Sequence, residues 1–108
     1  MKIGMLNCLK SNKCCAGAAC LNAFNRHEKF FERYKDEPVE LTAFARCNGC
    51  SAGIDDGFAE KLDRMVSEGI KAVHLGVCTT KDGKECFTIT KAAKYLSERG
   101  IEIVRGTH

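Results

Sequence analysis

Four short stretches rich in β-forming residues alternate with three stretches of helical periodicity, and this alternation restricts the possible folds more than any other feature. The predicted strands comprise residues 2–8, 39–47, 71–78 and 101–105. In a chain of this kind, successive strands are joined by right-handed helical crossovers and pair in parallel. The sequence therefore predicts an α/β fold built on one parallel sheet of four strands.

The three predicted helices place apolar residues at steps of three and four. The first is expected over residues 16–34, the second from Asp55 to Gly69, and the third over residues 90–99. The apolar stripe of the first helix consists of Cys20, Phe24, His27, Phe31 and Tyr34. Helices that follow parallel strands cover both faces of a sheet, so we expect three α/β/α layers with the flavodoxin-like strand order 2-1-3-4. Residues 1–108 are expected to form a single domain.

The charge pattern and the hydrophobic pattern argue against two classes of partner. The net charge is only +3, and basic residues are interleaved with acidic ones, which is typical of solvated helix faces and not of a nucleic-acid surface. The chain has neither the apolar run of a secretory signal nor about 18 consecutive apolar residues that would span a membrane. We therefore expect a cytoplasmic protein. In that compartment thiols stay reduced, so eight cysteines indicate metal or redox chemistry rather than disulfides.

Seven of the eight cysteines are predicted to lie at one edge of the sheet. They end a strand or stand in the loop or helical turn that follows one: Cys8, Cys14, Cys15, Cys47, Cys50, Cys78 and Cys86. In open α/β sheets, ligands bind outside the carboxyl ends of the strands, near the point where the strand order reverses. These seven cysteines are therefore the candidate metal ligands. A cluster of Cys8, Cys47 and Cys78 from neighbouring strands, completed by Cys50 and by one of the adjacent pair Cys14 and Cys15, is feasible.

The remaining cysteine and the histidines have other predicted places. Cys20 follows the buried stripe of the first helix and is expected in the core. His74 lies four residues before Cys78, about 13 Å back along an extended strand, and is expected to be a hydrogen-bonded interior residue. His27 is expected to pack or to lie at the surface. His108 follows the last strand at the cysteine edge and is a possible nitrogen ligand.

Together these motifs resemble the CGGC domain family, which is named for a central Cys-Gly-Gly-Cys and is regarded as metal-binding because of its cysteines and histidines. The matching motifs are Cys8, the segment CCAGAAC from Cys14 to Cys20, Cys47-Asn48-Gly49-Cys50, the strand from His74 to Cys78, Cys86 and the closing Gly106-Thr107-His108. Asn48 replaces the first glycine of the family motif, and Cys86-Phe87-Thr88 stands where the family is expected to have Cys-Pro-His. The resemblance covers nearly the whole chain and implies metal binding, but no reaction.

Three functions are consistent with these features. The favoured one is a protein that holds zinc, iron or an iron-sulfur cluster through cysteine thiolates; its expected partner is the metal ion, and the sequence does not indicate a protein partner. The alternative is a thiol-disulfide oxidoreductase in which Cys47 attacks from a helix start and Cys50 resolves. Against it, Pro38 is the single proline and cannot face the motif as a thioredoxin-like fold requires. A phosphatase-like anion cradle is disfavoured because Cys14 stands where its Cys-x5-Arg motif needs arginine. Whether the protein is an enzyme stays open.

Overall fold

The computed structural model describes residues 1–108 and has the predicted α/β fold. Its main sheet consists of β1 (Lys2–Asn7), β2 (Glu40–Arg46), β3 (Ala72–Leu75) and β6 (Glu102–Arg105). All pairings are parallel, and the spatial order is β2-β1-β3-β6. Numbered along the chain, these four strands have the expected order 2-1-3-4, so the fold prediction is confirmed.

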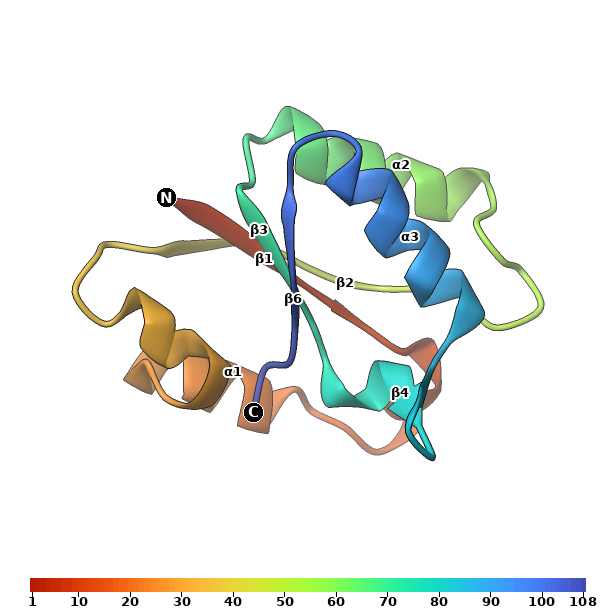
Figure 1. The fold of residues 1–108 in the computed structure, drawn as a ribbon. Coiled ribbons are helices and arrows are strands. Elements are labelled where there is room, and N and C mark those ends of the chain that lie inside the picture. The colour runs from red at the N-terminus through yellow and green to blue at the C-terminus, as the bar shows by residue number, and fades with distance from the viewer.

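Helices cover both faces of this sheet (Figure 1). On one face lie α2 (Asp56–Ser67) and α3 (Phe87–Ser97), and on the other lie α1 (Ala18–Arg26) and the 3-10 helix η2 (Lys29–Tyr34). The alternation of side chains along the strands separates two apolar clusters. The α2–α3 face is packed by Leu6, Phe58, Leu62, Val73, Leu75, Ile89 and Leu96. The α1 face is packed by Ile3, Met5, Cys20, Ala23, Phe31, Tyr34 and Ala72.

The prediction of one helix over residues 16–34 is wrong. Helix α1 ends at Arg26, because His27 adopts the left-handed conformation at φ 52°. The N–H groups of His27 and Glu28 donate to the carbonyls of Phe24 and Ala23, which closes the helix end. The chain then forms η2, whose Phe31 ring stacks on His74 with 4.3 Å between ring centroids. The apolar periodicity continues through the break because both pieces pack on the same face of the sheet.

The third strand is shorter than predicted. It ends at Leu75, and Cys78 lies in a separate 3-10 turn, η3 (Val77–Thr79). The hydroxyl and the N–H of Thr79 both donate to the Gly76 carbonyl, at 2.7 and 3.0 Å, and these bonds turn the chain away from the sheet. Cys78 therefore lies at the carboxyl edge, as predicted. The prediction that it ends the strand is wrong.

A small hairpin follows that the strand pattern did not predict. Strands β4 (Thr80–Lys81) and β5 (Lys84–Glu85) pair in antiparallel fashion around Asp82 and Gly83. Both turn residues have positive φ, 52° and 77°, as the Asp-Gly pair of a tight hairpin turn requires. The hairpin delivers Cys86 to the N-cap of α3, which begins at Phe87 and not at Thr90. Helix α2, by contrast, begins as expected, with the Asp55 carboxylate accepting the Phe58 N–H at 2.8 Å.

Candidate metal centre

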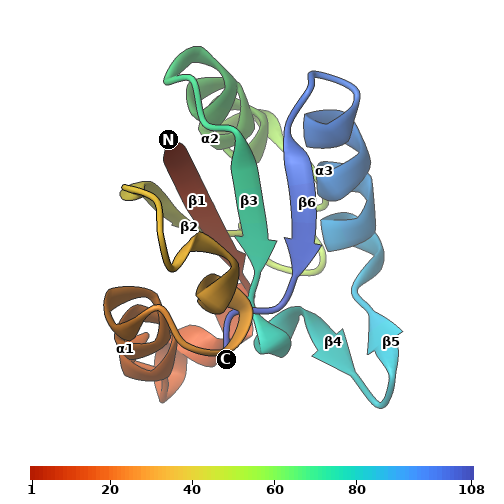
Figure 2. The same cartoon turned by 60° about the vertical axis from the view of Figure 1, so that its left-hand side comes forward.

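The carboxyl edge of the sheet gathers loops that come from distant parts of the chain. In Figure 2 the arrowheads of β3 and β6 point to the end of the molecule that also holds α1, the β4–β5 hairpin and the C-terminal residues. Cys8 and Cys47 directly follow β1 and β2, and Cys78 lies in the turn after β3. Since β1 lies between β2 and β3, these three cysteines follow adjacent strands.

Two of these sulfurs are already held by backbone donors. The Cys8 N–H donates to Cys78 Sγ at 3.2 Å, and the Leu9 N–H donates to Cys47 Sγ at 3.5 Å. Both donors belong to the start of the 3-10 helix η1 (Leu9–Lys13), where the first N–H groups have no partner within the helix. N–H groups directed at sulfur are the outer-shell contacts that orient and tune thiolate ligands of metals.

The thiol of Cys8 interacts electrostatically with the same two sulfurs, those of Cys47 and Cys78. Burial raises the pKa of Cys8, and the nearby sulfurs of Cys47 and Cys78 raise it further, while a hydrogen bond from the Lys10 backbone opposes the shift. Both burial and the neighbouring sulfurs make the Cys8 thiolate less favourable. A cation bound between these thiols would compensate the charge of the partly buried thiolate and the repulsion between thiolates.

A cavity of about 430 Å³ opens next to these sulfurs. It is lined by four of the candidate cysteines, Cys8, Cys50, Cys78 and Cys86. Three lysines and no carboxylate complete its charged lining: Lys10, Lys81 and Lys84. The Cys50 side chain is exposed and Cys86 is half-buried, so both have room to move. The cavity brings together sulfur donors from four separate loops, and its lysines would compensate the negative charge of a metal bound by several thiolates.

The donor set suits a thiophilic metal, but its present arrangement is open. No group of three or more Cys, His, Asp or Glu side chains converges closely enough to hold an ion. All eight cysteines carry free thiols. The thiol chemistry and the N–H donors around it fit zinc or iron, whereas closure of a coordination shell requires the side chains or loops to move.

The other candidate ligands lie further apart. Cys14 and Cys15 are both exposed after η1; Cys15 Sγ accepts the Gly17 N–H at 3.3 Å, and the Cys14 thiol points to the Ser11 carbonyl at 3.9 Å. Neither lines the cavity of about 430 Å³. His108 lines a second cavity of about 240 Å³, on the α1 side of the edge.

Cys20 and His74 are interior residues, as expected. Cys20 is buried and its sulfur lies 3.1 Å from the Thr107 hydroxyl, and burial raises the pKa of Cys20. His74 is fully buried, and its Nδ1–H donates to the Gly106 carbonyl at 2.9 Å. Its Nε2 therefore accepts from the Tyr34 hydroxyl at 2.7 Å, and burial lowers the pKa of His74, which keeps the ring neutral. His27 is partly exposed at the end of α1.

The expected place of the Cys47–Cys50 pair is wrong in one respect. Cys47 is only 4% exposed, and α2 begins at Asp56, so neither cysteine stands at a helix start. The intervening loop is held by Asn48, whose Nδ2 donates to Asp55 at 2.9 Å and whose Oδ1 accepts from Lys61 at 2.7 Å. In a dithiol reaction the exposed Cys50 would have to attack and Cys47 resolve, the reverse of the predicted roles.

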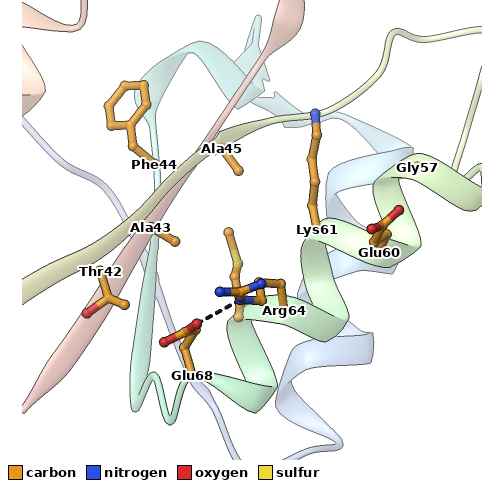
Figure 3. A pocket seen from close by; sticks show the side chains of 10 residues that line it. Thr42, Ala43, Phe44, Ala45, Gly57, Glu60, Lys61, Arg64 and Glu68 are labelled. Carbon is orange, nitrogen blue, oxygen red and sulfur yellow. Dashed lines mark hydrogen bonds and ion pairs between the residues drawn. The ribbon is translucent and has the colours of Figure 1, made fainter.

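The largest cavity, about 640 Å³, lies elsewhere and has no sulfur ligand. It separates β2 from α2, with Ala43 and Ala45 on one side and Arg64 on the other (Figure 3). Three of its four charged residues already have partners: Lys61 donates to the Arg46 carbonyl at 2.8 Å, and Arg64 forms an ion pair with Glu68 at 2.7 Å. No cysteine or histidine lines it, so it is not a thiolate centre.

Sequence reasoning missed the residues that surround the sulfurs. Asn7 is 3% exposed, and its Oδ1 accepts from the Cys78 thiol at 3.8 Å. Gly76 packs so closely on Asn7 that a side chain at this position would overlap the amide. The one available signal for Asn7 was a polar residue that directly follows the apolar run of β1 from Ile3 to Leu6. The sequence did not distinguish the three lysines that line the cavity from the other basic residues of the chain.

The fold and this edge define a thiol-rich α/β domain, and comparison with known proteins gives its family. The family model of the CGGC domain matches residues 2–108, so the chain belongs to the CGGC domain family. An uncharacterised protein from Methanocaldococcus jannaschii is 36% identical over 116 aligned positions, which cover 100% of this chain and 87% of that protein. No solved structure matches the chain. Membership in this cysteine-rich family suggests a metal-binding role. The longest helix, α2, has 12 residues, which is too short for a membrane-spanning helix.

Proposed function

We propose that this protein, as a single domain over residues 1–108, binds zinc, iron or an iron-sulfur cluster through cysteine thiolates at the carboxyl edge of its sheet. One observation carries the proposal: cysteines that follow three adjacent strands gather at one place, and backbone N–H groups already point at two of their sulfurs. Three of the free thiols, those of Cys14, Cys15 and Cys50, are exposed, and exposed thiols stay reduced in a reducing compartment. We therefore also propose that the protein works in the cytoplasm.

Cys8, Cys47 and Cys78 supply the fixed part of the proposed site. They stand next to the ordered sheet and are partly or fully buried. Cys50 and Cys86, which line the same cavity as Cys8 and Cys78, are the candidates to complete the shell, and Cys14, Cys15 and His108, which do not line it, are further candidates. A bound metal would supply a positive charge that holds several thiolates together; the protein would supply the sulfurs, their N–H donors and the lysine side chains around them.

Zinc titration of the reduced, metal-free protein tests this function. Cys78→Ser removes the sulfur that contacts both Cys8 and Asn7, and it should weaken zinc binding by at least 10-fold, the scale expected for loss of a thiolate ligand or its outer-shell support. Cys20→Ser is the matched control, because Cys20 is a buried thiol bonded to Thr107 outside the cavity that Cys78 lines with Cys8. Equal zinc affinity of the two variants and the wild type would refute the proposed site.

A further inference from the structure

The cavity of about 430 Å³ beside the sulfurs has a positive lining that no carboxylate balances. Lys10 reaches it from η1, and Lys81 and Lys84 reach it from the β4–β5 hairpin, whereas neither aspartate nor glutamate lines it. The three ion pairs of the protein all involve arginine side chains, so these three ammonium groups have no carboxylate partner. The cavity therefore combines thiols with cationic groups that are free to bind an anion.

The hairpin places two of these lysines against each other. Lys81 and Lys84 are direct partners in the antiparallel pairing of β4 with β5, so their side chains lie on the same face, where like charges destabilise a hairpin. The acidic residues of the hairpin do not relieve this repulsion: Asp82 occupies the turn and does not line the cavity, and Glu85 forms its ion pair with Arg105 at 2.8 Å. An anion bound in the cavity would remove the repulsion between the two lysines.

One of the four thiols in the cavity is accessible to a reagent from solution. Cys50 is exposed, and the other three cysteines that line the cavity are half-buried. Cys14 and Cys15 are also exposed, but they do not line this cavity. A cleft lined by charges of one sign raises the local concentration of reagents of the opposite sign. An anionic reagent for thiols should therefore be concentrated next to Cys50.

We propose that this cavity binds a small anionic disulfide, built from carboxylate-bearing thiols, and that Cys50 forms a mixed disulfide with it. The Cys50 thiol loses its proton to solvent, and the thiolate attacks one sulfur of the disulfide. The disulfide bond breaks, and its other half leaves as a thiolate that takes up a proton. Cys50 is thereby oxidised and the departing half reduced, so the disulfide itself is the oxidant.

The size of the cavity suits such a ligand, since sites for small molecules have volumes of roughly 300 to 1,000 Å³. In the bound state the lysines contact the carboxylates and the disulfide lies at Cys50. The modification requires no metal and goes beyond the proposed metal-binding function. It would also remove the Cys50 thiolate from the ligands available to a metal.

The rate at which Cys50 of the reduced, metal-free full chain is modified tests the proposal, with peptide mass spectrometry as the readout. The probes are three disulfides of different charge: dithiodiglycolate, a dianion; bis(hydroxyethyl) disulfide, which is neutral; and cystamine, a dication. Their leaving thiols differ in basicity, so each probe is compared between protein variants and not with the other probes.

Lys81→Met combined with Lys84→Met should slow the reaction of Cys50 with dithiodiglycolate by about 5- to 25-fold at an ionic strength of about 0.01 M. This range allows up to about fivefold for each lysine, the factor that one contact between opposite charges in water corresponds to. The rate with the neutral disulfide should stay the same, and the rate with cystamine should rise. Lys71→Met is the matched control, because Lys71 is an exposed lysine directly before β3, at the opposite edge of the sheet, and should leave all three rates unchanged.

Salt provides a second measurement that needs no variant. At an ionic strength of about 1 M the Debye length falls to about 3 Å, so the reaction of wild-type Cys50 with dithiodiglycolate should slow to nearly the rate of the double variant. Equal dithiodiglycolate rates in the wild type and the double variant would overturn the proposal. So would an equal decrease with all three disulfides, because that result would indicate a changed thiol or loop and not recognition of an anion. Since no metal is present, these outcomes do not depend on whether the proposed metal site exists.

Discussion

Replacement of Gly76 by alanine tests whether Asn7 and Cys78 are held as the structure shows them. The backbone of Gly76, at φ −64°, suits any residue, so alanine adds no conformational strain. The cost is steric. An added Cβ would overlap Asn7 Oδ1 and would lie 2.9 Å from Asn7 Cγ and 3.3 Å from Cys78 Sγ.

The neighbours of Gly76 have little room to give way. Asn7 is 3% exposed and cannot swing into solvent, so the strand ends must separate or the amide must leave its contact with the Cys78 thiol. Overpacking of this kind costs about 1 to 3 kcal/mol of unfolding free energy. For a domain of this size, each kcal/mol lowers the melting temperature by roughly 4 to 8 °C.

Urea unfolding of the reduced, metal-free protein measures this loss directly. Gly4→Ala is the control, since its Cβ would find Ile70 and Ala43 at 3.4 Å or more, an ordinary contact, and its stability should stay within about 0.5 kcal/mol of the wild type. Because Cys78 is displaced, Gly76→Ala should also bind zinc more weakly than Gly4→Ala. The reasoning fails if both variants are as stable as the wild type and bind zinc equally well.

Three more predictions concern the cysteine pair and the buried histidine. Cys47→Ser combined with Cys50→Ser should lower the metal content measured by elemental analysis while circular dichroism still shows the α/β fold. Unchanged metal content would show that the two cysteines are not metal ligands and only form part of a turn. The metal-loaded protein should reduce insulin far more slowly than a glutaredoxin does with the same thiol donor, and comparable turnover would favour the oxidoreductase function. Burial lowers the pKa of His74, so its contribution to stability is present above the unfolded value of about 6.5 and is lost as pH falls toward the folded pKa. Urea unfolding of the metal-free protein between pH 7.5 and 5 measures how the free energy of unfolding depends on pH. His74 should contribute a slope of up to about 1.4 kcal/mol per pH unit, and this contribution should be absent in His74→Asn. Equal slopes in the wild type and the variant would contradict a neutral, buried His74.

The strand order and the cysteine edge followed from the sequence because both depend on patterns that repeat along the chain. Apolar strands alternating with amphipathic helices restrict the sheet to parallel pairing, and the cysteines after β1, β2 and β3 then share one edge whatever the details of the loops. His74 is an interior residue as predicted, because it lies inside the apolar part of the third strand, which stays regular through Leu75. These conclusions tolerate errors of a few residues in the element bounds.

The errors arose where tertiary contacts override local periodicity. The stripe through Phe24 and Phe31 continues across the break at His27, because both halves pack on the same face of the sheet, so spacing alone could not reveal the turn. The bend that places Cys78 in a 3-10 turn depends on Thr79 and on a close approach of Gly76 to another strand.

Metal analysis of protein purified anaerobically without chelator tests the central claim most directly. Elemental analysis should find zinc or iron in stoichiometric amount, or the absorption spectrum should show an iron-sulfur cluster. A thiol reagent should then modify fewer than the eight cysteines until a chelator or denaturant releases the metal. Metal-free protein whose eight thiols all react at once, and which takes up neither zinc nor iron when they are supplied, would contradict the account.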